Sequence, residues 1–375
     1  MRLSRRHFLA SLLFASSCAG SGCTGSGDQD EDEPSGLLVD FHVHLFGVGD
    51  EGTGCFLSDR QRTFASTGIS PDYYPLLLRL LGLKENGQID RDYVSVLVGQ
   101  LRESSIEKAV LVGQDGRYDA DGILDRGATN FYVPNDYLLK VAREHPDLFV
   151  PCVSINPRRR DAFEELERCA EAGARVLKIH PPTQDVDPGL DRFRPFYRRL
   201  AELDILLMVH TGAEHGTPIV GDDFSHPARL VPALEEGCTV IAAHAGMGTF
   251  LDGVDFFPAL VDLLPRYPRL YCDSAVLAST IYWRSLPRIL EQDLVLERLI
   301  HGSDFPFPSN ALAFWNRLNP VDLLRLSSET NLLERDFRVK MALGLPAEVF
   351  ERGGRLLRLQ EGEAGALQGF HEVAF

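Results

Sequence analysis

The sequence predicts an α/β protein that folds as a (β/α)8 barrel with a long helical insertion after its first strand. Eight short apolar segments with strand character alternate with helical segments from residue 37 onward. Such alternation is typical of parallel strands joined by helices. The 375 residues are enough for one large barrel domain, and no internal repeat points to a solenoid.

Eight apolar segments are expected to form the barrel strands, and helical patterns fill the gaps between them. The strand segments are 37–44, 109–112, 149–155, 175–180, 205–210, 239–244, 270–273 and 298–304. The clearest helical segments between strands are 136–144, 161–172, 193–203 and 227–236. Asn135 is expected to cap the first of these helices, and Gly173 to end the second.

The connection after the first strand is unusually long. Residues 46–105 lie there, and helical patterns cover 73–83 and 91–103. Connections of this length inside a compact domain are usually functional or carry their own structure. Barrel enzymes build their sites at the ends of the strands that this insertion follows. We therefore expect a lid or pocket wall; an insertion without a functional role is the alternative.

The chain divides into an N-terminal segment (1–36), the barrel (37–360) and a C-terminal tail (361–375). The run from Ser4 to Leu9, SRRHFL, resembles a twin-arginine export signal, and the apolar stretch after it is too short to span a bilayer permanently. Export to the periplasm is expected. Cys18 follows a loose lipoprotein cleavage box and is a candidate for lipid anchoring. An uncleaved N-terminal helix is the alternative.

Charge and cysteine usage exclude two classes of protein. The net charge of −16 repels phosphate backbones, so the expected partner is a small-molecule substrate and not a nucleic acid. Seven cysteines are present without a CxxC pair, and five of them lie in the barrel region. An odd count without pairing motifs does not support a disulfide framework.

Polar residues recur where the predicted strands end. Asp40, His42 and His44 alternate along the first strand and share one face, so both imidazoles can converge on one ion. His210, His244 and Asp304 end the fifth, sixth and eighth strands. Imidazole and carboxylate ligands suit zinc, and also manganese, iron or nickel. The sequence therefore predicts a divalent metal site, with zinc favoured and one or two ions bound.

The fourth strand carries Lys178 and His180 on one face. Lys178 has three interpretations: a carboxylated lysine that bridges two metals, an ammonium that binds an anionic substrate group, or half of a structural ion pair. His180 is a candidate for substrate or metal binding. His301 has the opposite parity to Asp304 and is expected to face the helical shell.

These motifs together resemble one family. The segments DFHVH, LKIHPP, LMVHTG, AAHAG and GSDFP, in this order, are similar to the amidohydrolase superfamily. They are most similar to its amidohydrolase-related branch, which also contains decarboxylases and hydratases. The resemblance covers about residues 37–360. Where relatives usually carry an Asn-containing segment near the C-terminus, this chain has Glu351-Arg352-Gly353-Gly354.

The resemblance implies a TIM-like barrel and a set of roles. His42, His44 and His210 would bind metal, and Asp304 would bind metal and exchange a proton with the bound water. His244 would be a ligand of a second metal or a catalytic base, and Lys178 would bridge the ions of a binuclear site.

Hydrolysis of an amide, lactone or ester-like bond is the expected chemistry. A metal-bound water would attack, Asp304 would accept its proton, and His244 would stabilise the oxyanion. One alternative is non-oxidative decarboxylation or hydration of a small carboxylic acid. A second is a non-catalytic, exported metal-binding protein.

Overall fold

The computed structural model describes residues 34–65, 72–251 and 253–359. The predicted export signal, Cys18 and the tail 361–375 lie outside the described residues. Within the described part of the chain, no helix is long and apolar enough to cross a membrane. The five described cysteines are all buried and free, in agreement with the absence of a predicted disulfide framework.

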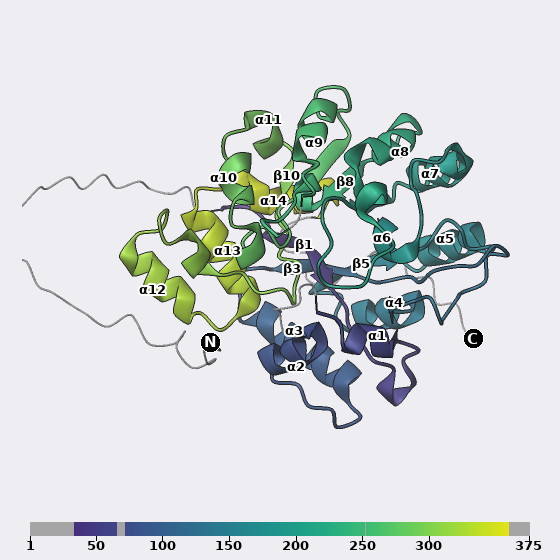
Figure 1. The fold of residues 1–375 in the computed structure, drawn as a ribbon, viewed down its shortest axis with the longest axis horizontal. Coiled ribbons are helices and arrows are strands. Elements are labelled where there is room, and N and C mark those ends of the chain that lie inside the picture. Colours follow the sequence, from purple (N-terminus) through teal and green to yellow (C-terminus); the bar gives the residue numbers. More distant parts are fainter. Residues whose placement is uncertain (1–33, 66–71, 252, 360–375) are drawn as a thin grey trace, which may run out of the picture. The chain divides into compact units, whose positions relative to one another are not determined.

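Eight parallel strands form the centre of the fold (Figure 1). In sheet order they are β1 (Val39–His44), β3 (Lys108–Val112), β5 (Phe149–Ser154), β6 (Val176–Ile179), β7 (Leu206–His210), β8 (Val240–Ala243), β9 (Leu270–Asp273) and β10 (Leu299–Ile300). Backbone N–H groups of Phe41 and His44 donate to the carbonyls of His301 and Phe305, each at 2.9 Å. These bonds join the last strand to the first, so the predicted barrel is confirmed.

Helices surround the strands on the outside of the barrel (Figure 1). They are α4 (Asn135–Glu144), α5 (Ala162–Glu171), α7 (Arg194–Glu202), α8 (Val231–Glu235), α9 (Phe257–Leu263), α10 (Ser285–Ile289), α11 (Asp293–Leu296), α12 (Pro320–Ser328), α13 (Leu332–Ala342) and α14 (Ala347–Leu356). Each longer helix buries one side. In α7, for example, Phe196, Tyr197 and Leu200 are buried, which is the spacing of one face.

The predicted cap of α4 is wrong. Pro134 occupies the N-cap position, and Asn135 is the first helical residue. The Asn135 side chain instead pairs with the end of β5: its Nδ2 donates to the Ser154 carbonyl at 3.1 Å, and its Oδ1 accepts from the Ser154 N–H at 3.0 Å. The amide therefore pairs with the backbone carbonyl and N–H of Ser154 at the end of β5. Local capping preferences do not predict this tertiary contact.

The insertion folds over the carboxyl end of the barrel strands. It contains β2 (Phe56–Leu57), α1 (Asp59–Arg62), α2 (Tyr73–Leu81) and α3 (Ile89–Arg102), and β2 pairs with β4 (Phe131–Tyr132). The buried Tyr93 of α3 donates its hydroxyl to the carbonyl of His44 at 2.6 Å. This bond ties the insertion directly to the end of β1.

The C-terminal helix closes the barrel against its first strand. A Cβ atom on Gly353 of α14 would lie 2.9 Å from Cδ2 of Phe41, and one on Gly354 would lie 3.3 Å from Cγ2 of Val39. The two glycines therefore allow α14 to approach β1 closely. This explains the Gly-Gly pair that departs from the usual family segment.

Candidate metal centre and substrate pocket

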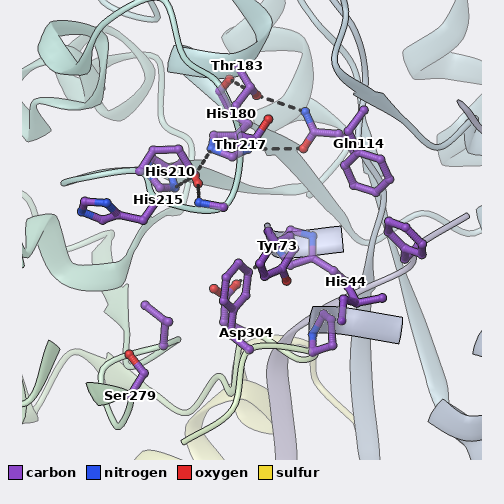
Figure 2. Close-up of a pocket in the computed structure, with 18 of the residues that line it drawn as sticks. His44, Tyr73, Gln114, His180, Thr183, His210, His215, Thr217, Ser279 and Asp304 are labelled. Atoms are coloured by element: carbon purple, nitrogen blue, oxygen red, sulfur yellow. Dashed lines mark hydrogen bonds and ion pairs between the residues drawn. The ribbon is translucent and has the colours of Figure 1, made fainter. Parts of the chain in front are cut away.

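A cavity of about 510 Å³ opens at the carboxyl ends of the strands. The predicted residues His44, Lys178, His180, His210, His244 and Asp304 all line it. Figure 2 shows side chains from both sides of the barrel pointing into this space. Active sites of barrel enzymes lie at this end of the strands.

His42, His44 and Asp304 form one of three groups of candidate metal ligands among the described residues; the others are His42, His244 and Asp273, and His180, His210 and Glu214. Asp304 Oδ1 lies 3.4 Å from His42 Nε2 and 3.2 Å from His44 Nε2. This oxygen is buried and has no hydrogen-bond partner of good geometry among the described residues. Burial alone would raise the pKa of Asp304, but His42, His244 and His44 together hold this pKa well below its usual range. An unpaired buried carboxylate oxygen that faces two imidazole nitrogens fits a divalent cation.

His42 is oriented by a carboxylate that the sequence analysis did not select. Its Nδ1 lies 2.8 Å from Asp273 Oδ2, so Nδ1 carries the proton and Nε2 presents its lone pair toward Asp304. Carboxylate–histidine pairs of this kind fix the tautomer of metal-binding histidines. Asp273 also accepts from the backbone N–H of His244 at 2.7 Å. A polar residue that ends an apolar strand was the signal available for finding it.

Asp40 lies behind the metal ligands and is not one of them. Its Oδ1 accepts from the backbone N–H groups of His42 at 3.1 Å and Ser303 at 2.9 Å. It therefore holds the loop that carries Asp304 against β1. Complete burial raises the pKa of Asp40 to about 7, with hydrogen bonds from Ser303 and His42 acting in the opposite direction.

His210 and His244 complete the inner wall. The buried Nε2 of His210 has no hydrogen-bond partner within the described part of the chain, and its ring centroid lies 4.7 Å from that of His244. His244 Nδ1 lies 3.1 Å from the carbonyl of Ala275, which leaves Nε2 as the free ring nitrogen. His210 therefore offers an unpaired lone pair to an ion, and His244 offers one for proton transfer.

Two of these residues adopt strained backbone conformations. The φ angles are +63° at His244 and +66° at Asp304, in the left-handed region that non-glycine residues rarely occupy. Each such residue costs roughly 1–3 kcal/mol and persists only where the surrounding structure fixes it. The strain thus lies at the residues that resemblance assigns to chemistry.

Lys178 lies at the floor of the cavity. Its buried Nζ is 2.9 Å from His42 Nε2 and 3.6 Å from Met208 Sδ. It forms no ion pair with a carboxylate among the residues described, which is contrary to the structural ion-pair alternative. Burial lowers the pKa of Lys178, and the charges of Asp273 and Asp304 oppose this effect.

His180 contacts Glu214, a second carboxylate that sequence reasoning missed. His180 Nε2 lies 2.7 Å from Glu214 Oε2, and the same oxygen is 3.7 Å from Nδ1 of His210. Glu214 belongs to the loop after β7, and a single acidic residue in a loop gives no signal that would identify it. His180, His210 and Glu214 form a second group with the spacing of metal ligands.

The outer walls of the cavity are apolar and aromatic. The insertion contributes Phe46, Leu57, Tyr73, Tyr74, Leu76 and Leu77. The rings of Tyr73 and Phe307 stack with centroids 4.9 Å apart. Gln61 of α1 joins the insertion to the loop after β7, because its Nε2 donates to the Gly216 carbonyl at 2.8 Å.

Comparison with known proteins identifies the family. The model of the Amidohydrolase family matches residues 107–329, which is more than half of the chain. The chain belongs to the amidohydrolase family. The match extends from the start of β3 to the end of α12 and does not include β1, so His42 and His44 are assigned by geometry. No curated protein sequence matches the chain.

Solved structures show the same fold. An uncharacterised TIM-barrel protein from Bordetella bronchiseptica is 15% identical, with a TM-score of 0.54 over 86% of this chain and 99% of that chain. A dihydroxybenzoic acid decarboxylase from Polaromonas sp. JS666, with bound manganese and the inhibitor 2-nitroresorcinol, is 18% identical, with a TM-score of 0.50 over 88% and 99%. Family, fold and donor set agree on a metal-dependent enzyme, as the motifs predicted.

Proposed function

We propose that this enzyme catalyses the non-oxidative decarboxylation of a small aromatic carboxylic acid. His42, His44, His210 and Asp304 would hold the divalent metal ion. The sequence favoured hydrolysis, with decarboxylation as the alternative. The composition of the cavity favours the alternative.

The observation that carries this proposal is the contrast between the floor and the walls of the cavity. Lys178 is the only lysine or arginine among the described lining residues, and it lies beside the candidate metal ligands. Aromatic and aliphatic side chains predominate in the outer walls, with a few neutral polar residues such as Gln61, Asn130 and Thr217 between them. A carboxylate at the floor and a planar ring between the walls would match both environments.

The hydrogen bond of Lys178 gives a second reason. Its Nζ donates to the lone pair of His42 Nε2, the same lone pair that a metal ion would use. An ammonium that loses its acceptor in a buried site needs another partner. A substrate carboxylate supplies that partner, and the metal and the ammonium would then bind one anionic group together.

The Polaromonas decarboxylase lends support at the level of the fold. Its structure contains manganese and a resorcinol derivative, so this barrel can accommodate a metal and a planar aromatic ligand. Histidine and carboxylate ligands suit manganese as well as zinc. We therefore propose manganese as the first metal to test, with zinc as the second.

The chain's own residues would supply the remaining chemistry. A bound divalent ion would polarise the oxygen atoms of the substrate. Lys178 would orient the carboxylate, and the apolar walls would exclude water from the ring. His244 Nε2 would first take up a proton from solvent and then deliver it to the ring carbon that bears the carboxylate. The bond from that carbon to the carboxylate then breaks, its electron pair returns to the ring, and carbon dioxide leaves.

Hydrolysis remains the second candidate because of one observation. Asp304 Oδ1 is buried without a hydrogen-bond partner among the described residues and lies 3.2 Å from His44 Nε2, so this carboxylate would be placed beside a bound ion to accept a proton from its water. A binuclear site with a carboxylated Lys178 would strengthen this candidate. Two ions per chain, together with the added mass of carbon dioxide on Lys178, would be its signature.

The test is a direct comparison of the two reactions. Protein loaded with manganese or zinc is incubated with benzoates whose carboxylate carries ¹³C, and labelled carbon dioxide is measured by mass spectrometry. A parallel panel contains esters, lactones and amides. The proposal predicts labelled carbon dioxide that is lost in Lys178→Met and retained in Lys84→Met, because Lys84 is exposed and does not line the cavity. Turnover of the second panel alone would refute it, and bound metal without turnover of either panel would favour a non-catalytic protein.

A further inference from the structure

We infer that the phenol hydroxyl of Tyr73, which the insertion brings to the cavity, donates a hydrogen bond to a carboxylate oxygen of the bound substrate. Tyr73 is the first residue of α2 and lines the cavity together with Asp304 (Figure 2). This inference rests on the proposed function, because that function supplies the carboxylate. It gives the insertion a direct part in substrate recognition, in addition to forming a wall.

The insertion places one polar group in the cavity lining that the described residues leave without a partner. Its described polar lining residues are Gln61, Tyr73 and Tyr74. The Gln61 amide donates to the Gly216 carbonyl at 2.8 Å and accepts from the Thr217 hydroxyl at 2.6 Å. The Tyr74 hydroxyl donates to Glu85 Oε1 at 2.9 Å. The Tyr73 hydroxyl makes no hydrogen bond with any residue that the structure describes, so it is available to a ligand.

The ring of Tyr73 is held in place from two sides. Its backbone N–H donates to the Phe64 carbonyl at 2.8 Å, and its ring stacks on Phe307 at an interplanar angle of 22°. The backbone N–H of Phe307 donates in turn to the Asp304 carbonyl at 2.9 Å. A Cβ atom on Gly216 would lie 2.7 Å from Cζ of Phe307, so the loop after β7 also confines this ring. The phenol is therefore held relative to the loop that carries Asp304, which lowers the entropic cost of binding a ligand.

The surroundings of Tyr73 keep its hydroxyl a neutral donor. Burial raises the pKa of Tyr73 well above its ordinary value of 10.0, and the charges of Asp304 and Glu214 act in the same direction. The same two carboxylates also act on Lys178, where they oppose the lowering of its pKa by burial. Tyr73 and Lys178 therefore lie within electrostatic reach of one region of the cavity, the first from the insertion and the second from the floor.

The chemistry of the hydroxyl selects the ligand group. In a cavity with largely apolar walls, a donor without an acceptor favours a ligand that supplies one. On a small aromatic acid, the carboxylate is the charged acceptor and forms the stronger hydrogen bond. Its two oxygens offer about four lone pairs, so one carboxylate can bind a metal ion, the Lys178 ammonium and the Tyr73 hydroxyl together.

Binding of benzoate to manganese-loaded protein tests this assignment without requiring turnover. Tyr73→Phe removes the hydroxyl and keeps the ring that stacks on Phe307. Calorimetry is expected to show benzoate binding weakened by roughly 10- to 100-fold, the range for a hydrogen bond to a charged group. Manganese content and melting temperature should stay as in the wild type, because the hydroxyl loses no partner among the described residues.

Tyr267→Phe is the matched control. It removes a phenol hydroxyl from the segment before β9, at the opposite end of that strand from the cavity, and Tyr267 is not among the described lining residues. It should bind benzoate as the wild type does. Unchanged benzoate affinity in Tyr73→Phe, no benzoate binding by the wild-type protein, or loss of manganese from Tyr73→Phe overturns the inference.

A crystal structure of the wild-type protein with manganese and benzoate gives a second measurement that needs no variant. The Tyr73 hydroxyl should lie within about 3 Å of a carboxylate oxygen, and an ordered benzoate whose carboxylate lies elsewhere overturns the inference. Weaker benzoate binding in Tyr73→Phe, without carbon dioxide release from any labelled benzoate, refutes the proposed function and leaves the role of Tyr73 standing. Carbon dioxide release with equal benzoate affinity in the two proteins refutes the role of Tyr73 and leaves the proposed function standing.

Discussion

Two buried carboxylates behind the cavity determine how the side chains of the candidate metal ligands are oriented. Asp273 orients the ring of His42, and Asp40 anchors the loop that carries Asp304. Neither belongs to the ligand group of His42, His44 and Asp304. Their effects on metal binding and on stability can be measured separately.

Replacing Asp273 tests its role as a positioning residue. Asp273→Asn weakens the partner of His42 Nδ1 and permits the wrong tautomer, so metal affinity is expected to fall roughly 10- to 100-fold. The measurement is competition with a metal-binding dye at constant pH. Ser279→Ala should show the wild-type affinity. A folded Asp273→Asn protein with unchanged affinity would contradict the assigned role.

Asp40 makes stability depend on pH in a defined direction. Its folded pKa is about 7, above the ordinary value of 3.8, so the folded state holds this proton after the unfolded chain has released it. The stabilisation is therefore complete below pH 4 and is lost as pH rises through 7, by about 4 kcal/mol. In metal-free protein, Asp40→Asn should remove this part of the pH dependence of the unfolding free energy.

The control for Asp40 is a half-exposed carboxylate. Asp92→Asn on the surface of α3 should leave the pH dependence as in the wild type. If the wild-type and Asp40→Asn proteins lose stability in parallel between pH 4 and 7, Asp40 is ionised throughout that range.

Single residues were predictable where they followed a strand pattern. Alternation along the first strand identified His42 and His44, and strand ends identified His210, His244 and Asp304. Asp273 also ends an apolar strand, but its importance arises from its contact with His42, which is distant in the sequence. Glu214 lies in a loop, where a single acidic residue gives no signal. His42 and Asp273 are 231 residues apart, a separation that no local pattern encodes.

The insertion is the element that distinguishes this pocket. The loop at the start of the insertion is held by reciprocal contacts that Asp50 and Asp90 make with each other's neighbouring backbone groups. Asp50 accepts from the backbone N–H groups of Ile89 and Asp90 at 2.7 and 3.0 Å. Asp90 accepts from the backbone N–H groups of Val48 and Gly49, and from the Thr53 hydroxyl. The loop after β1 and the start of α3 thus stabilise each other.

Truncation of Asp90 is expected to loosen this element. Asp90→Ala leaves the half-buried N–H groups of Val48 and Gly49 and the Thr53 hydroxyl without this acceptor, at a cost of roughly 1–3 kcal/mol. Urea denaturation measures the loss, and limited proteolysis should show earlier cleavage within residues 46–105. Asp92→Ala, two residues further along the same helix, should be nearly neutral. Equal stability of the two variants would show that these contacts do not hold the insertion.

Strands were predicted more reliably than helix ends. Seven of the eight apolar segments contain the observed strand, and the eighth, 109–112, begins one residue after β3 does, because parallel strands buried on both faces read as continuous apolar runs. The cap of α4 was wrong because Asn135 is used by β5 instead. Tertiary contacts determine such choices, and local preference cannot anticipate them.

At the scale of the whole molecule, the fold depends on closure of the barrel, in which the last strand meets the first. Helix α14 contacts both β1 and β10, the strands that meet when the barrel closes. Gly353 allows this contact by leaving room for Phe41. The family resemblance identified this segment as unusual, but only the packing explains it.

A matched pair of glycine substitutions tests the closure. Gly353→Ala places a methyl group against Phe41 and should destabilise the protein by about 1–3 kcal/mol. Gly99→Ala in α3 has open space around the new Cβ and should be neutral, or stabilising by roughly 0.5–1 kcal/mol. Unfolding free energies from urea titration provide the comparison. A neutral Gly353→Ala would mean that α14 adjusts without cost.

The most direct test of the metal centre is a crystal structure of the manganese-loaded protein, with anomalous data collected on both sides of the manganese absorption edge. We predict an anomalous peak within bonding distance of Nε2 of His42, His44 and His210, and of the Asp304 carboxylate. A peak confined to the His180–Glu214 pair, or no peak near Asp304 in protein shown to contain manganese, would contradict this account.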